Sequence, residues 1–272
     1  MQTLFLMRYS YFGSSGWQSP TSKDKSKLLS ADRLAKRFDL FRKITLPSLA
    51  AQSDGDFKLV ILSSAALPNW RKRQLTELCK DTLGDDRAHL AFRRPGGASL
   101  MFRKYIKKHL TDVPFGTQVV LDDDDAVSTS FVATLRKEAQ TVLDMHEHER
   151  QHSFLSFPRG LSLVLQDDGA RLFHRMMPFT NLGLSLVGPT NMRKNVYGIA
   201  HKKVADHNNA RVIYSNTPTY IRTCHDQNDS RAWHSEQEVS PDHMPAIMER
   251  FPMLQTFFPH DVAAHDGLPL AA

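Results

Sequence analysis

The sequence predicts an α/β protein with a mostly parallel central sheet, helices on both faces of that sheet, and a smaller antiparallel, β-rich lobe. In the first half of the chain, short apolar runs alternate with segments of helical periodicity, which is typical of a parallel sheet. In the second half, short strands follow one another, and the Asp-Asp-Gly sequence at residues 167–169 is a strong hairpin signal. With 272 residues, 41% of them hydrophobic, the chain can build a large core without disulfide bonds.

Four strands are predicted in the first half because each is a short apolar run bounded by turn-forming or polar residues. They cover residues 3–8, 57–62, 88–92 and 117–121. Strands that are buried on both faces of a parallel sheet are hydrophobic throughout, and the continuous run at 57–62 fits this role. The strand at 117–121 leads directly into four consecutive aspartates.

Between the first two strands, Ser30 is predicted to cap a helix because the apolar residues after it recur with the helical period. These apolar residues are Leu34, Phe38, Phe41 and Ile44. Pro47 is predicted to end this helix and to open a short turn over residues 47–52. The polar segment 10–30 that precedes the helix is predicted to be a mobile loop.

The remaining elements follow from the same patterns. Further helices are predicted from residue 68 to 83, from 98 to 110 with a basic surface, and over 128–148. Strands are predicted at 161–166, 170–174, 184–188, 211–214 and 219–223, with a short helix at 244–251. The sequence contains no segment typical of a linker, so we expect one continuous domain with halves at 1–130 and 131–272.

The net charge restricts the classes of partner. Thirty-five Lys and Arg against 29 Asp and Glu give a formal charge of +6, which favours anionic ligands such as nucleotides, phosphates or acidic lipid head groups. The basic residues occur as short pairs and triplets without interleaved aromatic residues, so we expect no nucleic-acid partner. The charge is compatible with a peripheral contact with a membrane.

The two cysteines and the hydropathy pattern indicate a compartment. Cys79 and Cys224 lie far apart and form no metal-binding spacing, which suits a reducing environment. No apolar run approaches the roughly 18 residues of a membrane span, and the apolar stretch at the start is too short for a signal peptide. We therefore expect a cytoplasmic protein without a transmembrane segment.

The four aspartates at residues 122–125 are the most informative feature. Ligands of open α/β sheets bind at the carboxyl ends of the strands, where these side chains are expected to lie. Clustered carboxylates repel one another unless a cation neutralises them, and oxygen ligands select Mg²⁺ or Mn²⁺ rather than Zn²⁺. The alternative is an acidic helix start, but four aspartates in a row add repulsion without adding capping contacts.

On these residues the chain resembles glycosyltransferases of the GT-A fold, and in particular the bacterial group of rhamnosyltransferases. The matching pieces are Arg8, Ser48-Leu49, Gln52, the strand at 57–62, the loop at 93–97, residues 121–125 and His225-Asp-Gln-Asn228. The resemblance implies a nucleotide-diphospho-sugar as donor, a divalent cation, and a glycan, lipid-linked or small-molecule acceptor. One departure is Ser63-Ser64-Ala65, where many relatives have an aspartate pair that reads the nucleobase.

Carried over position by position, the resemblance implies the following roles. Donor binding falls to Arg8, Gln52, Arg103, Asp122 and Asp123, and metal binding to Asp122, Asp124 and His225. Asp125 is a catalytic candidate that either supports the metal ligands or lies on the acceptor side. An inverting reaction needs a base for the acceptor proton, for which His201 and Asp206 lie in the appropriate region. Rival bases are Asp226, Asp229, Glu236 and Glu238.

Two other functions are compatible with the sequence. A different magnesium-dependent phosphoryl-transfer enzyme could use aspartates at strand ends, but such sites usually place a nucleophilic aspartate after the first strand, where Arg8 stands here. No Walker loop is present either. A non-catalytic polyanion-binding module would use the aspartates only at a helix start, and would bind without a divalent ion.

Overall fold

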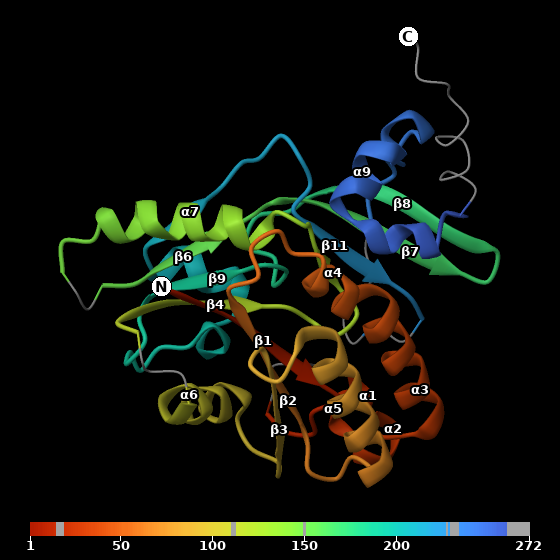
Figure 1. The fold of residues 1–272 in the computed structure, drawn as a ribbon, viewed down its shortest axis with the longest axis horizontal. Helices are drawn as coiled ribbons and strands as arrows, with labels where there is room; N and C mark the ends of the chain where they lie inside the picture. The colour runs from red at the N-terminus through yellow and green to blue at the C-terminus, as the bar shows by residue number, and fades with distance from the viewer. Residues whose placement is uncertain (15–18, 110–112, 149–150, 227, 229–233, 260–272) are drawn as a thin grey trace.

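The computed structural model describes residues 1–14, 19–109, 113–148, 151–226, 228 and 234–259. Within these residues the chain forms a seven-stranded sheet in the order β10-β6-β9-β4-β1-β2-β3 (Figure 1). Its strands are β1 (Gln2–Tyr9), β2 (Phe57–Ser64), β3 (Ala88–Arg93), β4 (Phe115–Val120), β6 (Ser153–Ser156), β9 (Ser185–Pro189) and β10 (Ala210–Val212). All neighbours are parallel except around β9, which is antiparallel to both β4 and β6. The predicted fold class, a mostly parallel sheet with a second smaller sheet, is confirmed.

The second sheet contains four strands in the described part of the chain, in the order β5-β11-β7-β8. They are β5 (Ala126–Val127), β7 (Arg159–Gln166), β8 (Gly169–Met176) and β11 (Tyr220–Cys224). The predicted hairpin is present, since Gln166 pairs with Gly169 across the β7–β8 turn. The sheet is mixed rather than antiparallel as expected, because β11 runs parallel to β7.

Helices cover both faces of the large sheet (Figure 1). One face carries α4 (Leu46–Ala50), α5 (Asn69–Leu83) and α7 (Phe131–Asp144), and the other carries α6 (Ala98–His109) and α8 (Val204–His207). Short 3-10 turns, η2 (Val196–Gly198) and η3 (His201–Lys203), lead into α8. The small sheet packs with η4 (Pro241–His243), α9 (Met244–Arg250) and η5 (Pro252–Thr256).

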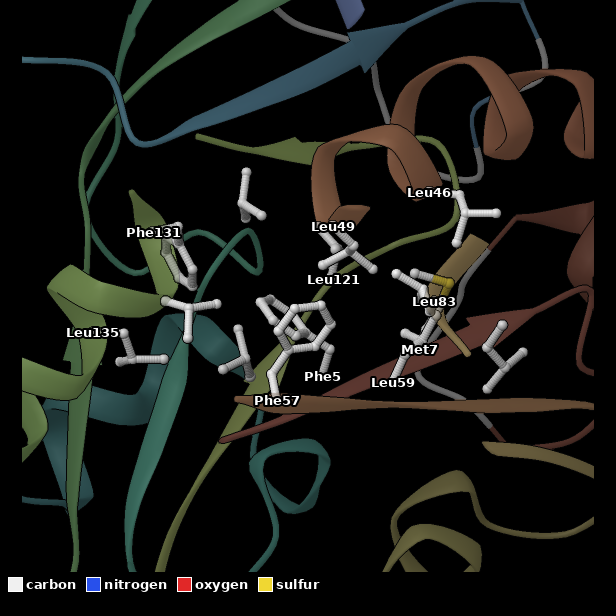
Figure 2. Close-up of a cluster of buried hydrophobic side chains, with 14 of the residues drawn as sticks. Phe5, Met7, Leu46, Leu49, Phe57, Leu59, Leu83, Leu121, Phe131 and Leu135 are labelled. Atoms are coloured by element: carbon white, nitrogen blue, oxygen red, sulfur yellow. The ribbon is translucent and has the colours of Figure 1, made fainter. Parts of the chain in front are cut away.

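Strand β1 shows why the sequence forms this layered core. Successive side chains of a strand point to opposite faces, so Phe5 and Met7 enter one hydrophobic cluster while Leu4 and Leu6 enter the other. Figure 2 shows Phe5 and Met7 among the side chains of the first cluster. A continuous apolar run is therefore required in this strand, and it marks a sheet that is covered on both faces.

The structure corrects three sequence-based expectations. The segment 10–30 contains two short helices, α1 (Pro20–Lys23) and α2 (Lys25–Leu28), with the Asp24 side chain accepting hydrogen bonds from two backbone amides at the start of α2. Pro47 does not end the preceding helix, because α3 (Ala31–Leu40) continues through the π-helical η1 (Phe41–Thr45) into α4. Pro47 lies in the first turn of α4, directly after the wider π-helical turn in which the Leu46 amide donates to the Phe41 carbonyl. Strand β6 was not expected.

Ser30 occupies the predicted N-cap of α3, although its side chain makes no capping hydrogen bond. The predicted helix at 128–148 is shorter, since α7 ends at Asp144. No helix within the described ranges has the length and apolar character needed to cross a membrane.

We predict that Phe5→Ala lowers the free energy of unfolding by about 3–5 kcal/mol. Phe5 is fully buried, and its ring contacts Phe57 edge-to-face with centroids 5.4 Å apart, so truncation leaves a cavity in the hydrophobic core. Urea unfolding followed by circular dichroism measures the change. The control Met145→Ala, at a side chain that is 65% exposed, should change stability by less than about 0.5 kcal/mol. Equal losses in the two variants would contradict this account of the core.

Candidate functional site

The carboxyl ends of β1 and β4 bring the first pair of charged residues together. The two strands are neighbours, so Arg8 at the end of β1 meets Asp122 just after β4, with Arg8 Nη2 3.1 Å from Asp122 Oδ1. The Arg8 guanidinium lies 4.8 Å from the centroid of the Tyr197 ring, and the Tyr197 hydroxyl donates a hydrogen bond to the Leu6 carbonyl oxygen. Tyr197 in turn stacks on Phe102 of α6. These contacts hold Arg8, only 3% exposed, against the carboxylate of Asp122.

A second arginine, Arg37 on α3, holds the next two aspartates. Its Nη1 donates to Asp124 Oδ2 at 2.7 Å, and its Nε donates to Asp123 Oδ2 at 3.3 Å. Its Nη2 also donates to Asp123 Oδ1, so the guanidinium binds Asp123 with two nitrogens. All three side chains are buried. A planar guanidinium is suited to such a bridge because its donors are fixed in one plane.

Asp124 also receives contacts from the segment that follows β11. His225 Nε2 lies 2.9 Å from Asp124 Oδ2, and Asn228 Nδ2 donates to the same oxygen at 3.2 Å. Asn228 Oδ1 accepts a hydrogen bond from the His225 backbone amide. Burial alone would raise the pKa of Asp124, but the positive charge of Arg37 and the contact with His225 outweigh it and hold the pKa well below its ordinary value. Asp124 is therefore a buried, ionised carboxylate.

Asp125 has a different environment, between the two sheets. It has no exposed surface, and it accepts hydrogen bonds from the Thr223 backbone amide at 2.8 Å and from Arg222 Nη1 at 3.3 Å. Burial raises the pKa of Asp125 to about 8, although Arg222 favours the ionised form. Because the carboxyl group has no exposed surface, this position does not favour the expected acceptor-side role. Its contacts instead join the segment after β4 to β11.

Asp122 and Asp124 each keep one oxygen that could bind a cation. Asp122 Oδ2 and Asp124 Oδ1 make no hydrogen bond to any residue that the structure describes. The same residues contain no ready group of three His, Cys, Asp or Glu side chains suited to a metal ion. Mg²⁺ is commonly bound by one or two carboxylates together with waters and substrate phosphates, and these two side chains are donors of that chemical type.

A cleft of about 490 Å³ opens beside this cluster. The starts of α1 to α3 and the turn after β11 supply its walls, which contain Thr21, Ser26, Lys27, Ser30, Asp32, Arg33, Asp226 and Asn228. Asn228 is shared by the cleft and by the contacts of Asp124. The carboxylate cluster is thus connected to a pocket of ligand size whose lining is mainly polar.

Gln52 has a different role from the predicted one. Its Nε2 donates to the carbonyl oxygens of Ser48 and Ser128, and its Oε1 accepts from the Val132 amide. Both amide hydrogens are therefore used within the protein, and the side chain holds the segment after the aspartates against α4. The geometry favours a positioning role over the expected contact with the nucleotide.

Three further predicted residues lie outside the cluster. Arg103 is exposed on α6, and Asp206 is exposed on α8. His201 is half-buried, and its Nδ1 lies 2.6 Å from the Phe179 carbonyl oxygen. The structure thus brings together Arg8, the four aspartates and His225, but not these three residues. The rival candidate Asp229 lies outside the described residues.

Sequence reasoning missed two arginines and one tyrosine that define the cluster. Arg37 follows Arg33 by four residues, so the two side chains lie on the same face of the helix, and both are buried. This pair of basic residues at helical spacing was the available signal. Arg222 interrupts an apolar strand, which is a recognisable signal for a buried cation with a partner. Tyr197 lies in an irregular segment and carries no such signal.

A sequence model described as "Putative rhamnosyl transferase" matches residues 2–237. A search of curated proteins gives no match. Among solved structures, S. aureus TarS 1-349 in complex with UDP has a TM-score of 0.42 and 12% identity, over 96% of this chain and 66% of that chain.

Two other solved structures are more weakly similar. S. aureus TarS 1-349 without UDP in its description has a TM-score of 0.41 and 13% identity, over 82% of this chain and 60% of that chain. Mouse xyloside xylosyltransferase 1 has a TM-score of 0.29 and 12% identity, over 57% of this chain and 53% of that chain.

We predict that Arg37→Met destabilises the protein by about 3–5 kcal/mol at pH 7, because it leaves two buried carboxylates without their cation. The pKa of Asp124 is lowered in the folded protein, so its stabilising contribution is complete above about pH 5 and is lost as the pH falls through the folded value. In the variant, protonation at low pH relieves the unpaired charges. The difference from the native chain should therefore shrink as the pH falls from 7 to about 4.

Chemical denaturation at each pH measures this effect. Arg42→Met is the matched control, because Arg42 forms an exposed ion pair with Asp39 on the same helical segment and should contribute less than about 1 kcal/mol. A pH-independent loss for Arg37→Met would indicate that only packing, and not charge, is involved.

Proposed function

Since the chain belongs to the glycosyltransferase family described as "Putative rhamnosyl transferase", we propose that it transfers a sugar from a nucleotide-diphospho-sugar to an acceptor hydroxyl. The match over residues 2–237 confirms the predicted family. The observation that supports the proposal is that Asp122 and Asp124 each have one carboxylate oxygen without a hydrogen bond to any described residue, beside a polar cleft at the carboxyl edge of the sheet. Rhamnose, named by the family description, is the first sugar to test.

Asp122 and Asp124 are the proposed ligands of a Mg²⁺ or Mn²⁺ ion, with His225 as a third candidate because it lies 2.9 Å from Asp124. When bound, a divalent ion stabilises the negative charge that develops on the leaving diphosphate. The protein's own contribution is to keep the two carboxylates ionised and in place. Arg8 holds Asp122, while Arg37 and Asn228 hold Asp124, so each carboxylate keeps one oxygen for the ion.

The cleft is the proposed donor site. Lys27 and Arg33 are its basic lining residues and the candidates to contact the diphosphate, while Asp32 and Asp226 are its acidic ones. Asp123 is buried and bound by Arg37, so its contribution is to fix Arg37 rather than to contact the donor. The expected donor contact by Arg103 remains a prediction.

The second half of the chain, residues 131–272, is proposed to bind the acceptor, which is a glycan, a lipid-linked sugar or a small molecule. His201 is the preferred base for an inverting reaction. Its Nδ1 is fixed by the Phe179 carbonyl, while its Nε2 makes no hydrogen bond within the described residues. It also follows Tyr197, which contacts Arg8, whereas Asp206 lies farther along on an exposed turn of α8.

We also propose that the protein acts in the cytoplasm. Cys79 and Cys224 are both buried free thiols, as a reducing compartment would keep them.

We predict that Asp122→Asn lowers sugar transfer by at least about a hundredfold, because the amide removes one charge from the proposed cation site. Removing divalent ions from the native chain with EDTA should have the same effect, and adding Mn²⁺ should restore the native chain only. Transfer is measured as nucleoside diphosphate release from nucleotide-rhamnose donors. Nucleotide diphosphate binding in a thermal-shift assay gives a second readout.

Asp168→Asn is the matched control, because Asp168 is an exposed aspartate in the β7–β8 turn. Circular dichroism shows whether each variant folds. Full turnover of a folded Asp122→Asn variant with Mn²⁺ would refute the proposed cation site, while a polyanion-binding module would bind nucleotide equally well in EDTA.

We predict that α1 and α2 become protected when the donor binds. Thr21, Ser26 and Lys27 line the cleft, and short helices with few buried residues open easily. Hydrogen exchange of residues 20–28 should slow on addition of nucleotide diphosphate with Mn²⁺. Exchange in α7, which packs against β6 and β9 away from the cleft, should not change. Unchanged exchange in 20–28 at saturating nucleotide would place the donor elsewhere.

A further inference from the structure

We propose that the carboxyl end of β3 and the first turns of α5 and α6 form a basic surface that binds anionic phospholipid membranes. We call this surface the β3 edge. It comprises Trp70, Arg71, Lys72, Arg73, Arg93, Arg94, Leu100, Arg103 and Lys104. Strand β3 is the last strand of the large sheet, and α5 and α6 flank it on opposite faces (Figure 1).

The β3 edge concentrates positive charge without any acidic residue. Segments 65–76 and 91–104 together contain seven Lys and Arg and no Asp or Glu. The acidic residues of α5 and of the turn after it lie towards the other end of the helix, from residue 77 onward. None of the seven basic side chains forms an ion pair with another residue that the structure describes. Arg71 and Lys72 are half-buried, and the other five basic side chains are exposed to solvent.

Contacts join the start of α5 to the end of β3. Lys72 Nζ lies 5.7 Å from the centroid of the Phe92 ring, and the Ala65 amide donates to the Arg93 carbonyl at 2.7 Å. Ser64 and Arg93 are also paired in the sheet. The ends of β2 and β3 thus place Arg71 to Arg73 beside Arg93 and Arg94.

Two exposed apolar residues favour a lipid surface over a nucleic acid. Trp70 is 53% exposed and Leu100 is 38% exposed, and they lie in the first turns of α5 and α6. Tryptophan beside cationic residues is typical of the membrane interface, where the ring enters the head-group region. One face of the Trp70 ring is covered by Arg71, at 4.1 Å, and Leu100 offers no planar face to a nucleobase.

The surface also has a consequence for the proposed reaction. The β3 edge and the carboxylate cluster lie at the same edge of the sheet, because both follow the carboxyl ends of parallel strands. If the proposed transferase function holds, membrane binding would bring the site close to a lipid-linked acceptor. The binding itself requires neither nucleotide nor metal and can be tested without them.

The test measures flotation of the full chain with vesicles of phosphatidylcholine alone or mixed with phosphatidylglycerol. Binding should require phosphatidylglycerol and weaken with salt. Each basic residue near an anionic surface contributes roughly a fivefold gain in partitioning, so Arg73→Gln/Arg94→Gln should bind about 25-fold more weakly. The control Lys80→Gln/Lys137→Gln removes two exposed charges, one from the other end of α5, and should bind within about twofold of the native chain.

A fluorescence measurement tests the apolar part of the surface. The native chain has three tryptophans, and its emission should shift to shorter wavelength on anionic vesicles, whereas Trp70→Phe should lose most of that shift. Equal losses in the two double variants, or no binding of the native chain to phosphatidylglycerol at low salt, would overturn the proposal. An RNA that binds more tightly than vesicles, and depends equally on Arg73 and Arg94, would also overturn it.

Discussion

The site depends on one electrostatic constraint, which is that four adjacent carboxyl groups must be accommodated inside the protein. Three guanidinium groups pair with them from three different elements: Arg8 from β1, Arg37 from α3 and Arg222 from β11. Burial raises the pKa of Asp125 to about 8, which favours its neutral form at pH 7. Isolated buried charges are very unfavourable, and pairing makes them tolerable only where the geometry and the hydrogen bonds are good. Each arginine therefore fixes the position of its element relative to the strand end at β4, and the site and the fold are determined together.

The same arrangement divides the quartet into two kinds of carboxylate. Asp123 and Asp125 are fully enclosed and serve as internal partners for Arg37 and Arg222. Asp122 and Asp124 are also paired, but each has an oxygen without an internal hydrogen bond. The backbone forms a turn here, in which the Asp125 amide donates to the Asp122 carbonyl, and this turn presents Asp123 and Asp124 together to Arg37. A run of four aspartates can thus supply two carboxylates with an oxygen free of internal hydrogen bonds and two structural anchors.

Much of the fold could be predicted from the sequence, because buried parallel strands are continuous apolar runs and the helices between them are amphipathic. The course of residues 31–50 could not be predicted, since Pro47 looks like a helix end unless the π-helical segment before it is known. The four aspartates indicated the site because their mutual repulsion demands a cation. The arginines that pair with the aspartates could not be identified from the neighbouring sequence, because Arg37 lies 87 residues from Asp124 and Arg222 lies 97 residues from Asp125. The contacts of Gln52 could not be predicted for a similar reason, because its partners are backbone groups, which every residue has and which leave no signal in the sequence.

The distances along the chain between the aspartates and their later partners have a consequence during synthesis. Asp124 is synthesised before its partners His225 and Asn228, which follow it by 101 and 104 residues. At ordinary ribosomal rates of roughly 5–20 residues per second, that interval lasts about 5 to 20 s. Throughout it, the nascent polypeptide already holds Arg8 and Arg37 but lacks the strand that seals the acidic patch, so water must hydrate Asp125 until β11 emerges.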